Sequence, residues 1–151
     1  MSLADRLRPC GPVFDPAAAA RVREVLAGSK AVDAAWPALE PMFAASPYLS
    51  GLARADPKRL ERMLASEPNS RRAAILAATR TVAPDARAAG RLRQLKAELH
   101  LLTALADLGG VWDLDQVTGA LTAFLGAIVV AVVGWILSLV IGAARVPTRA
   151  L

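Results

Sequence analysis

The sequence has few of the residues on which metal and redox sites are commonly built. Cys10 is the only cysteine and His100 the only histidine among 151 residues, and aromatic residues make up 5%. A single cysteine forms no internal disulfide, so nothing indicates an oxidising compartment. No cysteine or second histidine is placed to complete a zinc site with His100. We therefore expect no metal-ligating residue, and we interpret His100 as a packing or surface residue.

Acidic residues are missing after Asp115, and charge of either sign is missing from residues 116–144. The first residues, MSLADRLRPCGPVFDP, lack the apolar core of a secretion signal. The chain therefore divides into a charged part, which we expect to stay in the cytoplasm, and an uncharged part.

The formal net charge of +5 comes from basic residues that are interspersed with acidic ones. Two basic clusters, at Arg71-Arg72 and at residues 87–96, have the charge to meet RNA or an acidic protein. No aromatic residues interleave them, so solvated helix faces are the simpler interpretation. We expect no nucleic-acid partner.

Two Asp-Pro pairs indicate helix starts in the first half of the chain. Asp15 and Asp56 can each accept a hydrogen bond from the first turn of a helix, and the proline after each needs no N–H there. Gly28 is expected to end the first of these helices in the left-handed conformation. Prolines are expected to break residues 32–49 into short helical pieces: Pro37, Pro41 and Pro47. A small core is expected from Trp36, Phe43, Tyr48 and Leu49.

The strongest pattern lies in residues 85–110. Apolar side chains recur there at spacings of three and four, which places one stripe along a long helix: Leu92, Leu95, Leu99, Leu102 and Ala106. Gly109 and Gly110 should end this helix, and Asp113 with Gln116 resembles a capping box that starts another. No segment before the tail alternates with period two. The predicted fold class is all-α: short proline-punctuated helices, a long amphipathic helix and a C-terminal transmembrane helix.

One stretch resembles the N-terminal region of bacterial bifunctional glutamine synthetase adenylyltransferase/adenylyl-removing enzymes: RLRQLKAELHLLTALADLGGVWDLDQVTGALTAF, residues 91–124. It combines the capped helix start with residues that match the family: Lys96, Glu98, Asp107, Gly110 and Trp112. An earlier stretch is similar to the one that precedes the matched region in the family: SPYLSGLARADPKRLERML, residues 46–64. The resemblance covers about residues 13–124.

The resemblance implies a large cytoplasmic nucleotidyltransferase that transfers AMP from ATP to a tyrosine of glutamine synthetase and removes it by phosphorolysis. It implies glutamine synthetase and a PII signal protein as partners in nitrogen regulation. The family's ATP and magnesium sites use a Gly-Ser…Asp-x-Asp motif that begins downstream of the matched region. We therefore expect no catalytic, cofactor-binding or metal residue in this chain, and no activity of the chain alone.

Asp113 and Asp115 have the Asp-x-Asp spacing, but no Gly-Ser pair comes directly before them. They lie at an expected helix start, where side chains two residues apart point in different directions. We interpret Asp113 as a helix cap and Asp115 as an acid that favours the positive helix end.

Residues 121–144 form an uncharged run that departs from the family pattern at Phe124. As a helix these 24 residues reach about 36 Å, enough to cross a hydrocarbon core of about 30 Å. We expect a transmembrane helix there, and its evenly spaced small residues favour helix–helix association. A buried core helix is the alternative. The expected arrangement is a cytoplasmic domain with a C-terminal inner-membrane anchor.

The expected organisation has three parts: a helical domain in residues 1–112, a capped helix that continues into the membrane in residues 113–144, and a short basic tail in residues 145–151. The favoured hypothesis is a truncated or fused N-terminal fragment of the adenylyltransferase family, without its catalytic motif. Two alternatives stay open, namely a membrane-anchored helical adaptor and a holin-like small membrane protein.

Overall fold

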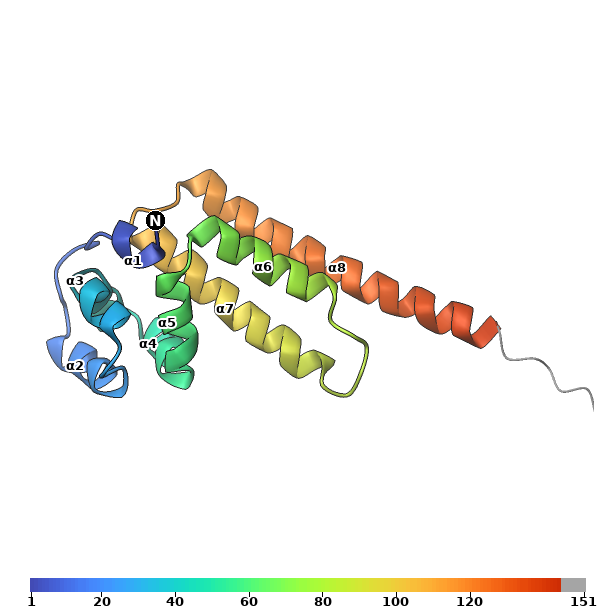
Figure 1. The fold of residues 1–151 in the computed structure, drawn as a ribbon, viewed down its shortest axis with the longest axis horizontal. Coiled ribbons are helices and arrows are strands. Elements are labelled where there is room, and N and C mark those ends of the chain that lie inside the picture. Colours follow the sequence, from blue (N-terminus) through green and yellow to red (C-terminus); the bar gives the residue numbers. More distant parts are fainter. Residues whose placement is uncertain (145–151) are drawn as a thin grey trace, which may run out of the picture.

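The computed structural model describes residues 1–144, and within them every regular element is an α-helix, so the all-α prediction is confirmed (Figure 1). The expected basic tail at residues 145–151 lies outside the described residues. The helices, in chain order, are α1 (Leu3–Arg6), α2 (Pro16–Val25), α3 (Lys30–Ala45), α4 (Pro47–Ala55), α5 (Pro57–Ala65), α6 (Pro68–Arg80), α7 (Ala88–Leu108) and α8 (Leu114–Ala144).

The caps expected from the sequence are present. The Asp15 carboxylate accepts from the Ala18 amide at 2.8 Å, and Asp56 accepts from the Arg59 amide at 2.9 Å. At the start of α8, the Gln116 amide donates to Asp113 at 2.8 Å and the Asp113 amide donates to Gln116 at 3.0 Å. Side-chain caps of this kind satisfy backbone donors that the helix itself leaves unpaired, so local sequence fixes these three helix starts.

The expected break within residues 32–49 occurs only before Pro47, because α3 continues through Pro37 and Pro41. The two prolines are four residues apart and so lie on one side of the helix. Asp33 and Pro37 are exposed, so water can satisfy the carbonyl that a missing proline N–H leaves unpaired. Helix α3 also buries much of its opposite side, and this packing outweighs the proline penalty: Val32, Ala35, Trp36, Leu39, Met42 and Phe43 are buried.

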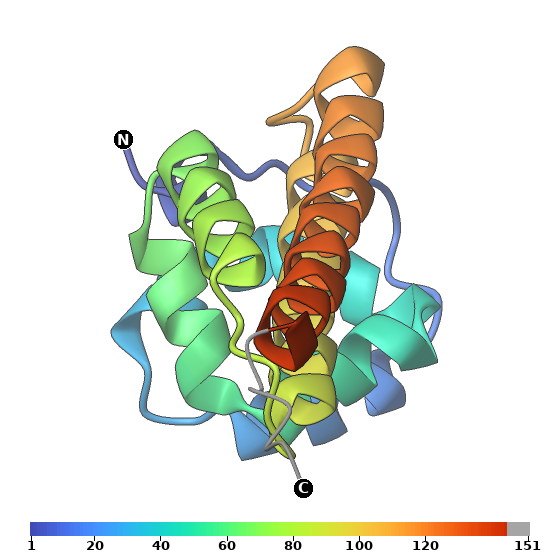
Figure 2. The same cartoon turned by 90° about the vertical axis from the view of Figure 1, so that its right-hand side faces the viewer.

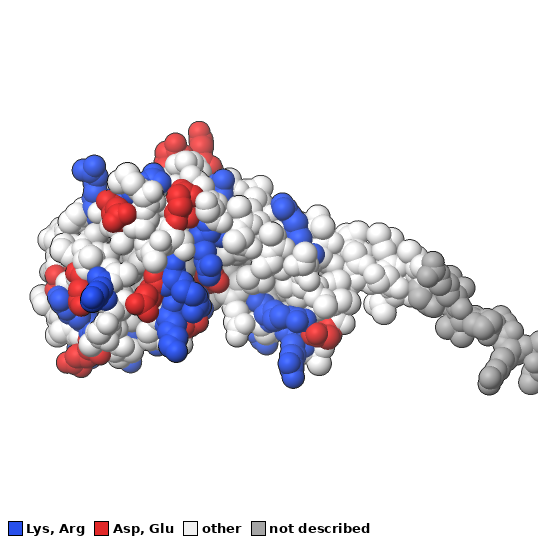
Figure 3. All heavy atoms as spheres, in the orientation of Figure 1, with Lys and Arg blue, Asp and Glu red and all other residues white. Residues whose placement is uncertain are grey.

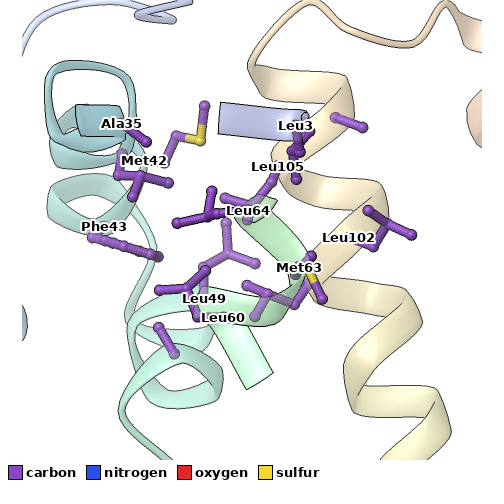
Figure 4. Close-up of a cluster of buried hydrophobic side chains, with 14 of the residues drawn as sticks. Leu3, Ala35, Met42, Phe43, Leu49, Leu60, Met63, Leu64, Leu102 and Leu105 are labelled. Atoms are coloured by element: carbon purple, nitrogen blue, oxygen red, sulfur yellow. The ribbon is translucent and has the colours of Figure 1, made fainter. Parts of the chain in front are cut away.

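The main core lies where α1, α3, α4 and α5 meet the C-terminal half of α7 (Figure 4). Its fully buried side chains come from helices far apart in sequence: Leu3, Leu60, Met63, Leu64, Leu102 and Leu105. The core expected around Trp36, Phe43 and Leu49 is part of it, but Tyr48 is 56% exposed. The predicted α7 stripe is confirmed most clearly at its C-terminal end, where Leu99, Leu102 and Ala106 are buried.

The short N-terminal segment closes this core against the turn between α7 and α8. The Leu3 amide donates to the Ser66 carbonyl, the Arg8 amide donates to the Gly109 carbonyl, and the Arg6 guanidinium donates to the Val111 carbonyl at 3.2 Å. A Cβ atom at Gly109 would collide with the Leu7 side chain, so this close approach requires glycine.

Helices α6, α7 and α8 form a second layer, in which α6 and α8 lie side by side (Figures 1 and 2). The side of α8 that packs here is a stripe of four buried residues at spacings of four, three and four: Ala120, Phe124, Ala127 and Ala131. The Trp135 indole donates to the Val82 carbonyl at 2.8 Å, which ties α8 to the connection between α6 and α7. Beyond Trp135, α8 projects away from the rest of the chain (Figure 1).

Candidate interaction surfaces

A groove of about 470 Å³ lies between α4, α7 and α8. Its apolar lining comes from all three helices: Leu49, Ala104, Val117 and Leu121. Its polar lining is concentrated on α4 and α7: Ser46, Tyr48, His100, Thr103 and Asp107. A concave apolar floor with a few polar groups is the usual composition of a binding site.

The Tyr48 hydroxyl and His100 Nδ1 are hydrogen-bonded at 2.9 Å on one side of this groove. Partial burial lowers the pKa of His100 below its usual 6.5, and the positive charge of Lys96 lowers it further. Both effects favour the neutral imidazole. His100 is thus a half-buried residue whose partner, Tyr48, is the only tyrosine in the sequence, a pairing that the sequence interpretation missed.

Thr103 also faces this groove and is only 6% exposed. Its hydroxyl has no hydrogen-bond partner among the described residues. A buried hydroxyl without a partner is costly to the fold. The sequence gives no signal for this, because a threonine within a helix usually bonds back to its own backbone.

The second surface is the side of α8 that no other helix covers. By length and composition, Leu114–Ile141 is long and apolar enough to cross a membrane; its most apolar stretch has a mean hydropathy of 2.8, and 17% of that stretch is buried. Large apolar side chains are exposed along it from Val129 onward: Val129, Val130, Val132, Val133, Ile136, Leu137, Leu139, Val140 and Ile141. A contiguous apolar patch of this kind is typical of a protein or membrane contact.

The two basic clusters take part in contacts within the chain. Arg71 forms an ion pair with Glu98, and the Arg72 guanidinium lies 5.6 Å from the ring centre of Trp112. Arg91 is paired with Asp85 at 2.7 Å. Parts of both clusters are therefore engaged within the fold, while Arg80 and Arg87 are exposed, and the absence of a nucleic-acid partner stays a prediction.

The residues that the sequence singled out for chemistry do not come together. Cys10 is exposed in the connection between α1 and α2, and Asp113 is used in the α8 cap. Among residues 1–144, no three His, Cys, Asp or Glu side chains are grouped as metal ligands. The expectation that the chain holds no catalytic, cofactor or metal residue stays a prediction.

Comparisons with known proteins identify the family. The sequence model of glutamate-ammonia ligase adenylyltransferases matches residues 36–150. The match therefore extends through the uncharged run, residues 121–144, where we expected a departure from the family pattern at Phe124. No solved structure matches the chain.

Three relatives are bifunctional glutamine synthetase adenylyltransferase/adenylyl-removing enzymes. The Caulobacter vibrioides enzyme is 62% identical over 83% of this chain, and the Bradyrhizobium diazoefficiens enzyme is 52% identical over 51%. An enzyme of Rhodopseudomonas palustris strain TIE-1 is 42% identical over 72%. These matches cover 14%, 8% and 11% of the relatives' own lengths, so the chain spans a small part of them. The chain belongs to the glutamate-ammonia ligase adenylyltransferase family.

Proposed function

We propose that residues 1–144 act as a non-catalytic helical binding unit in the control of glutamine synthetase by adenylylation. The relatives are named for adenylylating glutamine synthetase and reversing that modification. The observation that supports a binding role is the groove between α4, α7 and α8, which combines an apolar lining with a few polar side chains. Glutamine synthetase is the first partner to test, and a PII signal protein is the second.

The groove suits a protein segment better than a nucleotide. Its floor is apolar, and the charged side chain that lines it is the acidic Asp107, which repels phosphate. Leu121 from α8 and Tyr48 from α4 are both more than 40% exposed at its edges. An apolar anchor of a partner can occupy such a floor.

Binding and catalysis can be tested in one experiment with purified chain and purified glutamine synthetase. We expect measurable association by calorimetry, and no transfer of radiolabelled AMP from ATP. Leu121→Glu places a charge at the apolar edge of the groove and should weaken association at least tenfold. Leu125→Glu is the matched control, because Leu125 is exposed on the same helix outside the groove lining.

Either of two results contradicts this proposal. One is equal binding by the Leu121→Glu and Leu125→Glu chains. The other is ATP-dependent labelling of glutamine synthetase that a point substitution in this chain abolishes. Repeating the titration with a PII protein shows whether the same groove also serves that partner.

A second proposed function is membrane attachment through α8, with the helical domain in the cytoplasm at the inner membrane. The supporting observation is the row of exposed apolar residues between Val129 and Ile141. The same observation is compatible with a membrane-anchored adaptor and, more distantly, with a holin-like protein. Flotation of the chain with lipid vesicles tests attachment directly, and failure to float with any vesicle rules it out.

A further inference from the structure

We propose that the free end of α8, residues 136–144, lies along an anionic lipid surface. Two arginines beside the start of this free end, Arg80 and Arg87, would bind the lipid headgroups. In this arrangement α8 does not cross the bilayer as long as it remains packed against α6. The inference rests on the proposed membrane attachment and specifies the lipid class and the depth.

The first step is the length of helix that is free to enter lipid. The Trp135–Val82 hydrogen bond places the connection between α6 and α7 beside Trp135. The uncharged run ends nine residues later, at Ala144, because Arg145 follows it in the sequence. Nine helical residues reach about 14 Å, less than half of a hydrocarbon core of about 30 Å. The free end is therefore too short to cross a bilayer.

The second step is what a full span would bring into the lipid. Trp135 lies close to the middle of the expected span, residues 121–144. A span of those residues would carry the neighbouring α6–α7 connection to the same depth, together with Arg80, Asp85 and Arg87. Irregular backbone exposed to lipid is not tolerated in the hydrocarbon core, and charged side chains there are costly. Helix α8 therefore cannot cross the bilayer while it stays packed against α6.

The third step is the charge at the base of the free end. Residues 80–96 contain five basic side chains and one acidic side chain. Arg91 is paired with Asp85, whereas Arg80 and Arg87 are exposed and have no acidic partner among residues 1–144. In Figure 3 blue side chains lie on either side of the place where the white free end of α8 begins.

The fourth step is the direction in which the free end lies. Five large side chains around it are each more than half exposed: Ile136, Leu137, Leu139, Val140 and Ile141. In the sequence Arg145 follows the uncharged run, and Arg80 and Arg87 flank the α6–α7 connection that Trp135 contacts at the other end. An apolar segment with cations at both ends suits a helix in the plane of the interface, buried by about 5–10 Å among anionic headgroups.

The experiment is flotation of the full chain with two kinds of vesicle, one of phosphatidylcholine alone and one with 30 mol% phosphatidylglycerol. We expect tighter binding to the anionic vesicles, weakened by salt. Arg80→Gln and Arg87→Gln should each reduce that binding about fivefold, because a surface arginine contributes roughly 1 kcal/mol. Arg54→Gln and Arg62→Gln are matched controls on α4 and α5, also exposed and without an acidic partner, and should have little effect.

Carbonate washing and quenching by brominated lipids then measure depth. A Cys10→Ser, Leu139→Cys chain carrying a fluorophore should be quenched best by bromines near the headgroups, and carbonate should release it. Deep quenching, resistance to carbonate and equal binding to neutral vesicles would show attachment by a spanning helix and overturn this inference alone. Equal losses in the control arginine variants would also overturn it. A chain that self-associates through α8 and ignores both vesicles contradicts this inference and membrane attachment together.

Discussion

The two halves of α8, divided at Trp135, are both rich in apolar residues but have different surroundings. From Gln116 to Ala144 neither half carries a charge. In the first half, Ala120, Phe124, Ala127 and Ala131 are buried within the fold. In the second half, beyond Trp135, every side chain described through Ile141 is exposed. Hydropathy alone thus does not distinguish a core helix from a free apolar one.

The difference arises from the length of the neighbouring helix. Helix α6 ends at Arg80, and the connection that follows reaches Trp135 through Val82. Three of the four stripe residues are alanines, whose small side chains let the two helices approach closely. Beyond the end of α6 no described residue covers α8, so its apolar side chains have nothing to pack against.

The largest effect should come from a charge placed in the packed half. Ala127 is 1% exposed, so Ala127→Asp buries a carboxylate in the layer of α6, α7 and α8 without a partner. We expect a loss of about 3–5 kcal/mol in the free energy of unfolding, measured by urea titration. Leu137→Asp, in the free half, should change it by no more than about 0.5 kcal/mol. Similar losses in both variants would remove the distinction between the halves.

A cavity tests the same distinction without charge. Phe124 is 6% exposed and its neighbour Leu125 is 64% exposed. Phe124→Ala should cost about 3 kcal/mol, through lost burial and the cavity that remains. Leu125→Ala should cost only about 0.5 kcal/mol or less. The comparison fails if truncating Leu125 destabilises the chain as much as truncating Phe124.

These contrasts also show which parts of the fold the sequence predicts. The α7 stripe is visible because leucines alternate with charged residues, and the caps at Asp15, Asp56 and Asp113 are local signals. The α8 stripe is hidden, because its buried alanines stand among residues that are equally apolar. Pro37 and Pro41 predict breaks that packing overrides. Packing across several helices cannot be read from local patterns.

The groove could not be predicted for a related reason. Tyr48, Thr103 and Leu121 come from three helices and share no spacing that the sequence displays. The interpretation of His100 as a packing or surface residue agrees with its half-buried side chain but does not include its hydrogen-bond partner. Its tyrosine partner lies 52 residues away, and only the tertiary fold brings the two rings together.

A smaller effect is expected at the boundary between the two halves of α8. Trp135→Phe keeps most of the apolar ring and removes the donor to the Val82 carbonyl. The expected loss is about 1 kcal/mol in the free energy of unfolding. Hydrogen exchange should show faster exchange in the α6–α7 connection and unchanged exchange in α3. No change at residues 81–87 would mean that Trp135 does not fix the end of the packed half.

The smallest effect is a pH dependence that arises outside residues 116–144, which contain no titratable side chain, and involves His100 on α7. Burial, and then Lys96, lower the pKa of His100 below 6.5, so the unfolded chain binds a proton more readily than the folded one. The stability that this histidine contributes is therefore complete above about pH 6.5 and is lost as the pH falls below that value.

Urea midpoints measured between pH 7.5 and 5.0 should decline slightly for the natural chain, and His100→Gln should flatten that decline. The carboxylates with lowered pKa values, Asp5, Glu67 and Asp85, have ordinary values of 3.8 to 4.5, so their contributions change mainly below this window. Tyr48→Phe is the control, because burial and Lys96, not the tyrosine, cause the shift. A decline that persists in His100→Gln would assign the pH dependence to another group.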